Sequence, residues 1–133
     1  MAKGYLNCLK KRELIQDEAA NREVLGRYGR DYLNQGRPLE ALEFFEQARD
    51  EEGLRALKAL GVEEGDTFLY KQACRLLKET PDPADWKTIG EKALAAGKYQ
   101  QALTAFQAIP DEPRVQEVER LIYELTQHDE QQS

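Results

Sequence analysis

Residues 25–45 read LGRYGRDYLNQGRPLEALEFF, and residues 86–106 read WKTIGEKALAAGKYQQALTAF. The two stretches align without a gap at an offset of 61 residues. Six positions are identical: Gly29/Gly90, Leu33/Leu94, Gly36/Gly97, Ala41/Ala102, Leu42/Leu103 and Phe45/Phe106. Constant internal spacing of this kind indicates that one supersecondary unit is used more than once.

Each copy predicts two antiparallel helices joined by a tight turn. In the first copy, Leu25, Tyr28 and Tyr32 recur at helical spacing and form an apolar stripe. Gly36 follows the stripe, where a left-handed residue ends a helix at little cost. Pro38 suits the first turn of the next helix, because its missing N–H has no partner to lose there. The shared Ala and Phe then fall on one face of that second helix.

Composition favours an all-α fold. The chain has 133 residues, of which 41% are apolar and 33% are charged, and this length can bury a core without metals or disulfides. Good helix formers dominate, and β-branched residues are too few for a substantial sheet. The net charge of −6 is uneven, because residues 1–37 carry +3 and residues 38–133 carry −9.

The offset is close to twice a usual helical-repeat length, so a third, degenerate unit is expected between the two copies. In one alternative Gly65 is the turn glycine, with Tyr70 and Cys74 in the places of the small residue and the aromatic. In the other, Gly61 and Ala73 match and Phe68 replaces the turn glycine. The second is favoured for packing, since Ala73 leaves room between helices where Tyr70 would not.

The predicted organisation is a single domain over residues 1–133. The pattern predicts seven or eight helices, near residues 4–15, 18–34, 38–50, 52–61, 66–79, 84–96, 99–108 and 113–127. The expected segments are an N-terminal helix (1–21), a first repeat (22–53), a degenerate middle repeat (54–82), a third repeat (83–112), a capping helix (113–128) and a frayed tail (129–133).

The repeated residues resemble the tetratricopeptide (TPR) repeat, whose signature is a Trp or Leu, a large residue followed by Gly, a turn Gly, then Ala and Phe. The resemblance implies a short right-handed α–α superhelix of about three helix–turn–helix units with N- and C-terminal capping helices. In that family the first helices of the pairs line a concave groove that holds partner polypeptides. The residues beside the packing stripe become candidate partner-binding residues: Glu23, Arg30, Asn34, Arg55, Lys87 and Glu91.

The expected function is therefore a protein–protein interaction scaffold or adaptor. Arg30, Arg55 and Lys87 come from three successive first helices, which favours an extended acidic segment as the partner. The alternative for these cations is that they pair with Glu23, Glu52 and Glu91 and only solubilise the surface. The alternative function is a self-assembling, homo-oligomeric repeat module. Phe44 lies next to Phe45 but on another face, so it is a candidate for contact with a neighbouring unit or a partner.

The sequence offers little support for other classes of function. No cofactor or metal motif and no catalytic constellation stands out, and the lone His128 lacks an indicated nucleophile or further ligands, so we expect a protein that is not an enzyme. The acidic body argues against nucleic-acid binding. No apolar stretch approaches the length of a membrane span or a secretory signal, which predicts a cytoplasmic protein.

Overall fold

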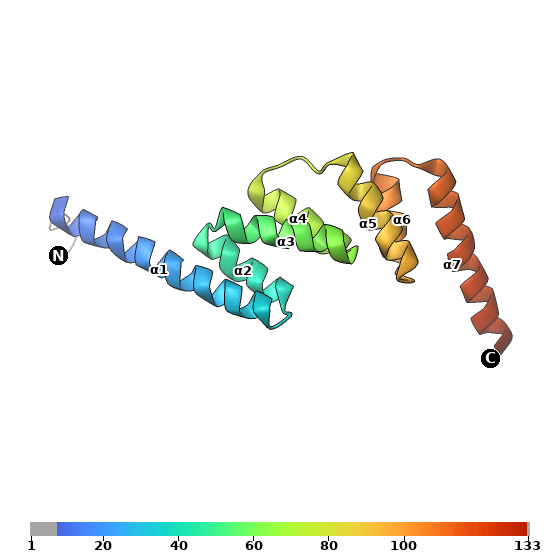
Figure 1. The fold of residues 1–133 in the computed structure, drawn as a ribbon, viewed down its shortest axis with the longest axis horizontal. Coiled ribbons are helices and arrows are strands. Elements are labelled where there is room, and N and C mark those ends of the chain that lie inside the picture. Colours follow the sequence, from blue (N-terminus) through green and yellow to red (C-terminus); the bar gives the residue numbers. More distant parts are fainter. Residues whose placement is uncertain (1–7, 133) are drawn as a thin grey trace, which may run out of the picture. The chain divides into compact units, whose positions relative to one another are not determined.

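The computed structural model describes residues 8–132 and the side chains of residues 17–128. Within residues 8–132 the chain forms seven helices and no strand, which confirms the all-α prediction (Figure 1). The helices are α1 (Cys8–Asn34), α2 (Pro38–Ala48), α3 (Glu51–Glu64), α4 (Thr67–Leu77), α5 (Pro83–Ala95), α6 (Tyr99–Ala108) and α7 (Glu112–Gln132). The chain divides into two compact units, Met1–Leu54 and Arg55–Ser133, and the division falls inside α3.

In the first unit, the C-terminal half of α1 packs against α2 around a phenylalanine ring. Phe45 and Ala41 of α2 are fully buried. Gly29 of α1 lies against that ring, since a Cβ at this position would be 2.5 Å from Cε1 of Phe45. Gly53, at the start of α3, approaches the same ring equally closely. The helix-propensity cost of Gly29, about 1 kcal/mol, is thus offset by close packing of the paired helices.

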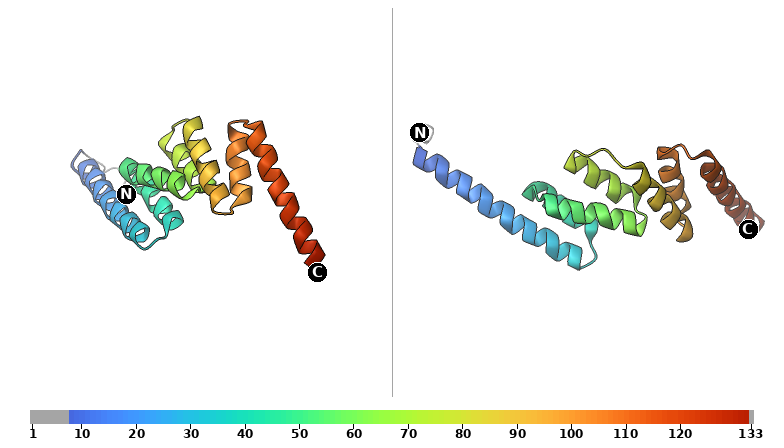
Figure 2. Two further views of the ribbon diagram at one scale, coloured as in Figure 1. Left: turned by 45° about the vertical axis from the view of Figure 1, so that its right-hand side comes forward. Right: turned by 45° about the horizontal axis from the view of Figure 1, so that its top comes forward.

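The second unit contains α4 to α7 and most of α3, and both views in Figure 2 show α5 and α6 side by side. Gly90 of α5 meets Phe106 of α6 as Gly29 meets Phe45, with a Cβ at Gly90 placed 2.6 Å from the ring. Phe106 also packs with Val115 and Val118 of α7, which are buried. The apolar side of the third helix pair is therefore covered by the first half of α7.

Three hairpin turns of the chain have the same hydrogen-bonding pattern. Gly36, Gly65 and Gly97 are left-handed, with φ of 76°, 67° and 76°. In each turn the next residue donates its N–H to a carbonyl five positions back, at 2.9 Å from residue 37, 2.8 Å from residue 66 and 2.8 Å from residue 98. These are Schellman turns, in which glycine avoids the steric cost of the left-handed conformation.

The turn of the middle pair corrects the favoured alternative from the sequence. The turn glycine is Gly65, as in the first alternative, and Phe68 lies in the first turn of α4 with 55% of its surface exposed. Tyr70 does not crowd the helix pair, because Gly61 packs against its backbone and its ring turns toward Trp86. The argument from side-chain size failed because it assumed that the ring lies between α3 and α4.

The first and last helices also differ from the prediction. No break occurs between residues 15 and 18, because α1 is continuous from Cys8 to Asn34. That stretch has neither Gly nor Pro, so nothing stops the helix there. Likewise, α7 continues to Gln132 instead of ending in a frayed tail, since Glu and Gln support helix to its end. Residues 4–7 of the predicted first helix, and Ser133 of the predicted tail, lie outside the described residues.

Candidate functional site

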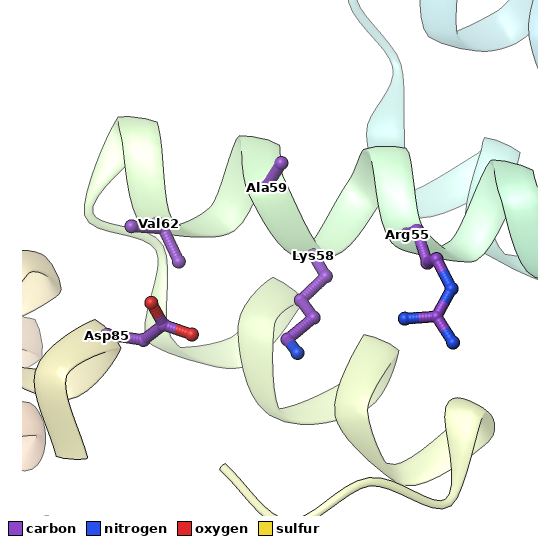
Figure 3. Close-up of a pocket in the computed structure, with 5 residues that line it drawn as sticks. All are labelled: Arg55, Lys58, Ala59, Val62 and Asp85. Atoms are coloured by element: carbon purple, nitrogen blue, oxygen red, sulfur yellow. The ribbon is translucent and has the colours of Figure 1, made fainter. Parts of the chain in front are cut away.

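A surface depression of about 370 Å³ lies on one side of α3 and the start of α5. It is lined by Arg55, Lys58, Ala59 and Val62 of α3 and by Asp85 of α5 (Figure 3). The spacing of three and four residues places the α3 side chains on one face of the helix. This α3/α5 depression is therefore cationic at one end and apolar in the middle, and it has a carboxylate beside Val62 at the other end.

The cationic end of the α3/α5 depression holds a carboxylate of the protein itself. Glu79, just after α4, places Oε2 at 2.8 Å from Nη1 of Arg55 and Oε1 at 3.0 Å from Nζ of Lys58. The hydrogen bond from Lys58, followed by that from Arg55, lowers the pKa of Glu79, and the same bond raises the pKa of Lys58. These shifts keep Glu79 and Lys58 charged at neutral pH, and one carboxylate meets both basic side chains.

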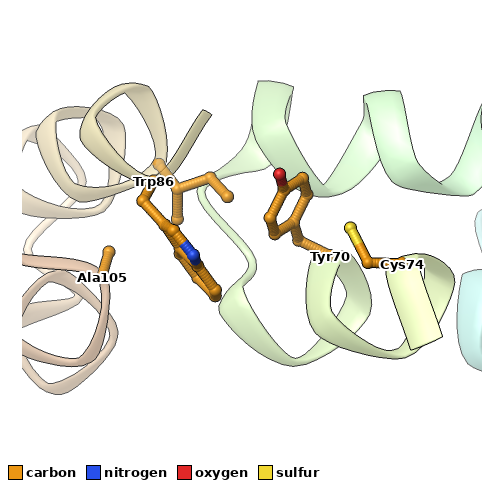
Figure 4. Close-up of a cluster of buried hydrophobic side chains, with 5 residues drawn as sticks. Tyr70, Cys74, Trp86 and Ala105 are labelled. Carbon is orange, nitrogen blue, oxygen red and sulfur yellow. The ribbon is translucent and has the colours of Figure 1, made fainter. Parts of the chain in front are cut away.

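The carboxylate at the other end is held by a buried tyrosine. The Tyr70 hydroxyl donates to Oδ2 of Asp85 at 2.9 Å and accepts the backbone N–H of Asp82 at 3.0 Å. Burial raises the pKa of Tyr70, so the hydroxyl keeps its proton and remains a donor. Its ring meets Trp86 edge-on at 5.0 Å between centroids, and Cys74 packs in the same cluster (Figure 4). Core packing thus fixes the position of Asp85.

A second depression, also of about 370 Å³, lies on the first unit. It is lined by residues of α1 and of the segment that leads from α2 into α3: Arg22, Glu23, Gly26, Arg27, Arg30, Ala48 and Asp50. Arg30 places Nη2 at 2.9 Å from Oδ2 of Asp50, whose Oδ1 accepts the N–H of Gly53 at 3.0 Å. Gly26 leaves room for this pair, because a Cβ there would come within 3.2 Å of Asp50.

The structure brings some of the predicted groove residues to these depressions. Glu23 and Arg30 line the depression of the first unit, and Arg55 lines the α3/α5 depression. Asn34, Lys87 and Glu91 line neither. Asn34 and Lys87 are exposed, and Glu91 lies 3.4 Å from Arg114 of α7.

The acidic partners predicted for Arg30 and Arg55 were wrong. Glu23 pairs with Arg27 at 3.6 Å, whereas Arg30 pairs with Asp50 and Arg55 with Glu79. Asp50 and Glu79 occupy equivalent places, since each donates its N–H to a carbonyl five residues back in the second helix of its pair. The sequence signal is an acid five residues after the buried residue of the second helix, which is Phe45 for Asp50 and Cys74 for Glu79. Lys58 and Asp85 were missed because their place depends on how α3 meets α5.

The outer face of the first helix pair carries a stack of aromatic side chains. Phe44 is half-buried between Tyr28, at 5.7 Å between ring centroids, and Tyr32, at 5.2 Å and nearly parallel. The Arg37 guanidinium lies over the Tyr32 ring at 5.2 Å. Tyr28 is 51% exposed, and Leu39 on α2 is 50% exposed. We call Tyr28, Tyr32 and Phe44 the aromatic face.

The described part of the chain holds no cluster of metal-ligating side chains. No group of three or more His, Cys, Asp or Glu there could hold a metal ion. Cys74 is buried, and burial raises the pKa of its thiol, which disfavours the nucleophilic thiolate. None of the helices described is long and apolar enough to cross a membrane.

Comparison of the chain with protein-family models, with curated proteins and with solved structures finds no match.

Proposed function

We propose that this chain is a TPR-like repeat protein that holds extended segments of partner polypeptides on the exposed faces of its first helices. The repeat assignment is supported by the matching contacts Gly29–Phe45 and Gly90–Phe106 and by three left-handed turn glycines. In the second unit, the turn at Gly65 packs on the α5 backbone, so the middle pair stacks on the third. Such stacking is the basis of helical-repeat arrays.

The observation that carries the proposal is that both depressions described above involve first helices. One is formed mainly by α1 and the other by α3 and α5. Both contain charged side chains beside apolar or small residues, which suits recognition of a peptide by a few polar contacts and apolar packing. Each exposed ion pair contributes only about 0.2–1 kcal/mol, so the charges select the ligand while apolar contacts supply most of the affinity.

The test is selection of ligands from a random peptide-display library on the immobilised wild-type protein. We expect enrichment of sequences with acidic residues, and weaker binding at higher salt because screening shortens the reach of the charges. Combined replacement of Arg30, Arg55 and Lys87 by Gln should then weaken the selected peptides about 3- to 100-fold, from three pairs of about 0.2–1 kcal/mol each.

A matched variant distinguishes the effect of charge position on binding from the effect of net charge. Lys71, Lys92 and Lys98 are exposed lysines whose replacement by Gln removes the same net charge. This control should bind the selected peptides nearly as wild type does. Equal losses in both triple variants would show that net charge, and not the first-helix face, governs binding. A library that yields no ligand would refute the proposed function.

The aromatic face favours a second candidate function, self-assembly through this surface. Tyr28 is about half exposed, and Phe44 forms a continuous apolar contact with Tyr28 and Tyr32. In repeat arrays the terminal units normally present a polar outer face. An apolar end face is therefore the expected surface for contact between copies.

If the chain self-assembles by this face, the mass measured by light scattering should rise with concentration. Replacing Tyr28 by Ser should then restore the monomer mass at all concentrations, because about half of this side chain is already in water and folding should be little affected. Replacement of the equally exposed Phe68 by Ser is the control. A wild-type mass that stays monomeric at every concentration would contradict self-assembly.

A further inference from the structure

We infer that the α3/α5 depression binds an extended peptide that carries an acidic residue and a basic residue about three positions apart, with apolar residues between them. The inference rests on the proposed function and specifies the partner of the same face. It concerns only the second unit, in which all five lining residues lie.

The acidic residue of the ligand is specified by the α3 cations. Arg55 and Lys58 already hold both oxygens of a carboxylate, at 2.8 and 3.0 Å. That carboxylate belongs to Glu79, whose side chain is 29% exposed and therefore open to exchange with solvent. A ligand carboxylate fits the same two cations, either beside Glu79 or in its place. Glu79 then competes with the ligand.

The basic residue of the ligand is specified by Asp85. One oxygen of this carboxylate accepts the Tyr70 hydroxyl at 2.9 Å, which fixes its direction. Figure 3 shows the carboxylate beside Val62, at the end of the depression away from Arg55. A Lys or Arg of the ligand that reaches this end meets a held negative charge, and a second acidic residue there would be repelled.

The separation between the acidic and the basic residue of the ligand follows from helix geometry. Arg55 and Val62 are seven residues apart on α3, which corresponds to about 10 Å along the helix axis at ~1.5 Å per residue. An extended peptide covers that distance in about three residues at ~3.3 Å each. Between the charged ends, Ala59 and Val62 offer apolar surface to the side chains in the middle of the ligand.

The experiment measures binding of a fluorescent peptide with the central sequence Glu-Val-Val-Lys, blocked at both ends so that no terminal charge contributes. Replacing either charged residue of the peptide by Gln should weaken binding about two- to fivefold, as expected for one exposed ion pair. In the protein, Glu79→Gln should tighten binding of the parent peptide by a similar factor, because the competing carboxylate is removed.

Double-mutant cycles assign each charge to its partner. The combined variant Arg55→Gln and Lys58→Gln should abolish the effect of replacing the peptide's Glu, and Asp85→Asn should abolish the effect of replacing its Lys. Asn at position 85 keeps a carbonyl oxygen to accept the Tyr70 hydroxyl, so the fold is preserved. Lys71→Gln is the control for loss of an exposed cation, and equal melting temperatures check that all variants remain folded.

The outcomes separate this inference from the proposed function. The inference is overturned if the parent peptide does not bind, if its affinity is insensitive to Glu79→Gln, or if the charge effects in the two cycles are additive. If library-selected peptides bind with affinities that these variants do not change, the proposed function stands and the occupant of this depression has been misidentified. If the library yields no ligand, the proposed function itself fails.

Discussion

Replacing Phe106 with alanine should destabilise the second unit by about 3–5 kcal/mol, the usual cost of removing a buried phenylalanine ring. Phe106 is fully buried and packs with Val115 and Val118 of α7 as well as with α5. The loss should appear as a lower denaturation midpoint when helicity is followed in urea. Phe68→Ala is the matched control, because 55% of Phe68 is exposed and its truncation should cost less than about 1 kcal/mol.

A second substitution tests the repeat packing itself. A Cβ at Gly90 would lie 2.6 Å from the Phe106 ring, so Gly90→Ala should destabilise the wild-type protein by overpacking. In the Phe106→Ala background the ring is gone, and the same substitution should stabilise by up to about 1 kcal/mol through helix propensity. If Gly90→Ala has the same sign in both backgrounds, the glycine and the ring are not packing partners.

The parts of the fold that the sequence predicted correctly are set by local chemistry. Gly36 and Gly97 end helices because the left-handed conformation is nearly free for glycine. Pro38 begins α2 because its fixed φ suits the first turn. The spacing of the shared Ala and Phe predicted which face of the second helix packs, and both residues are fully buried in each copy. None of these inferences needed long-range contacts.

The errors in the fold concern features that local chemistry does not fix. The continuity of α1 through residues 15–18 depends on whether a polar stretch stays helical, which composition alone leaves open. In the middle pair, the two alternatives placed either Gly65 or Phe68 in the turn, and Gly65 takes that role while Gly61 supplies the close contact. Only the direction of the Tyr70 side chain, set by Trp86 and Asp85, resolves the choice.

Three of the six predicted groove residues, Glu23, Arg30 and Arg55, line the two depressions, and Asn34, Lys87 and Glu91 do not. Helical periodicity is enough to place Arg30 and Arg55 on the exposed side of first helices. Their carboxylate partners, Asp50 and Glu79, follow second helices, so the pairing appears only when the hairpins are folded. Asp85 joins the site because α5 approaches α3, a contact between successive pairs that periodicity along one helix does not encode.

Deleting residues 113–133 should destabilise the second unit by about 3–6 kcal/mol and cause aggregation. Val115 and Val118 of α7 are buried against the third helix pair, and full burial of one such side chain contributes about 1.5–3 kcal/mol. Their removal also exposes Phe106 and Ala102, which are fully buried in the intact protein. Repeat arrays that lose a terminal cap present apolar surface to water and associate through it.

The matched control is a shorter deletion, residues 124–133, which leaves Val115 and Val118 of α7 in place. Glu124, Leu125 and Thr126 are exposed, so this variant should remain monomeric and lose less than about 1 kcal/mol. Light scattering measures the oligomeric state, and urea denaturation measures the loss of stability. If both truncated proteins are equally stable and monomeric, α7 does not cap the third pair. If both aggregate, then the exposed second half of α7 is needed for solubility, and burial of Val115 and Val118 does not explain its role.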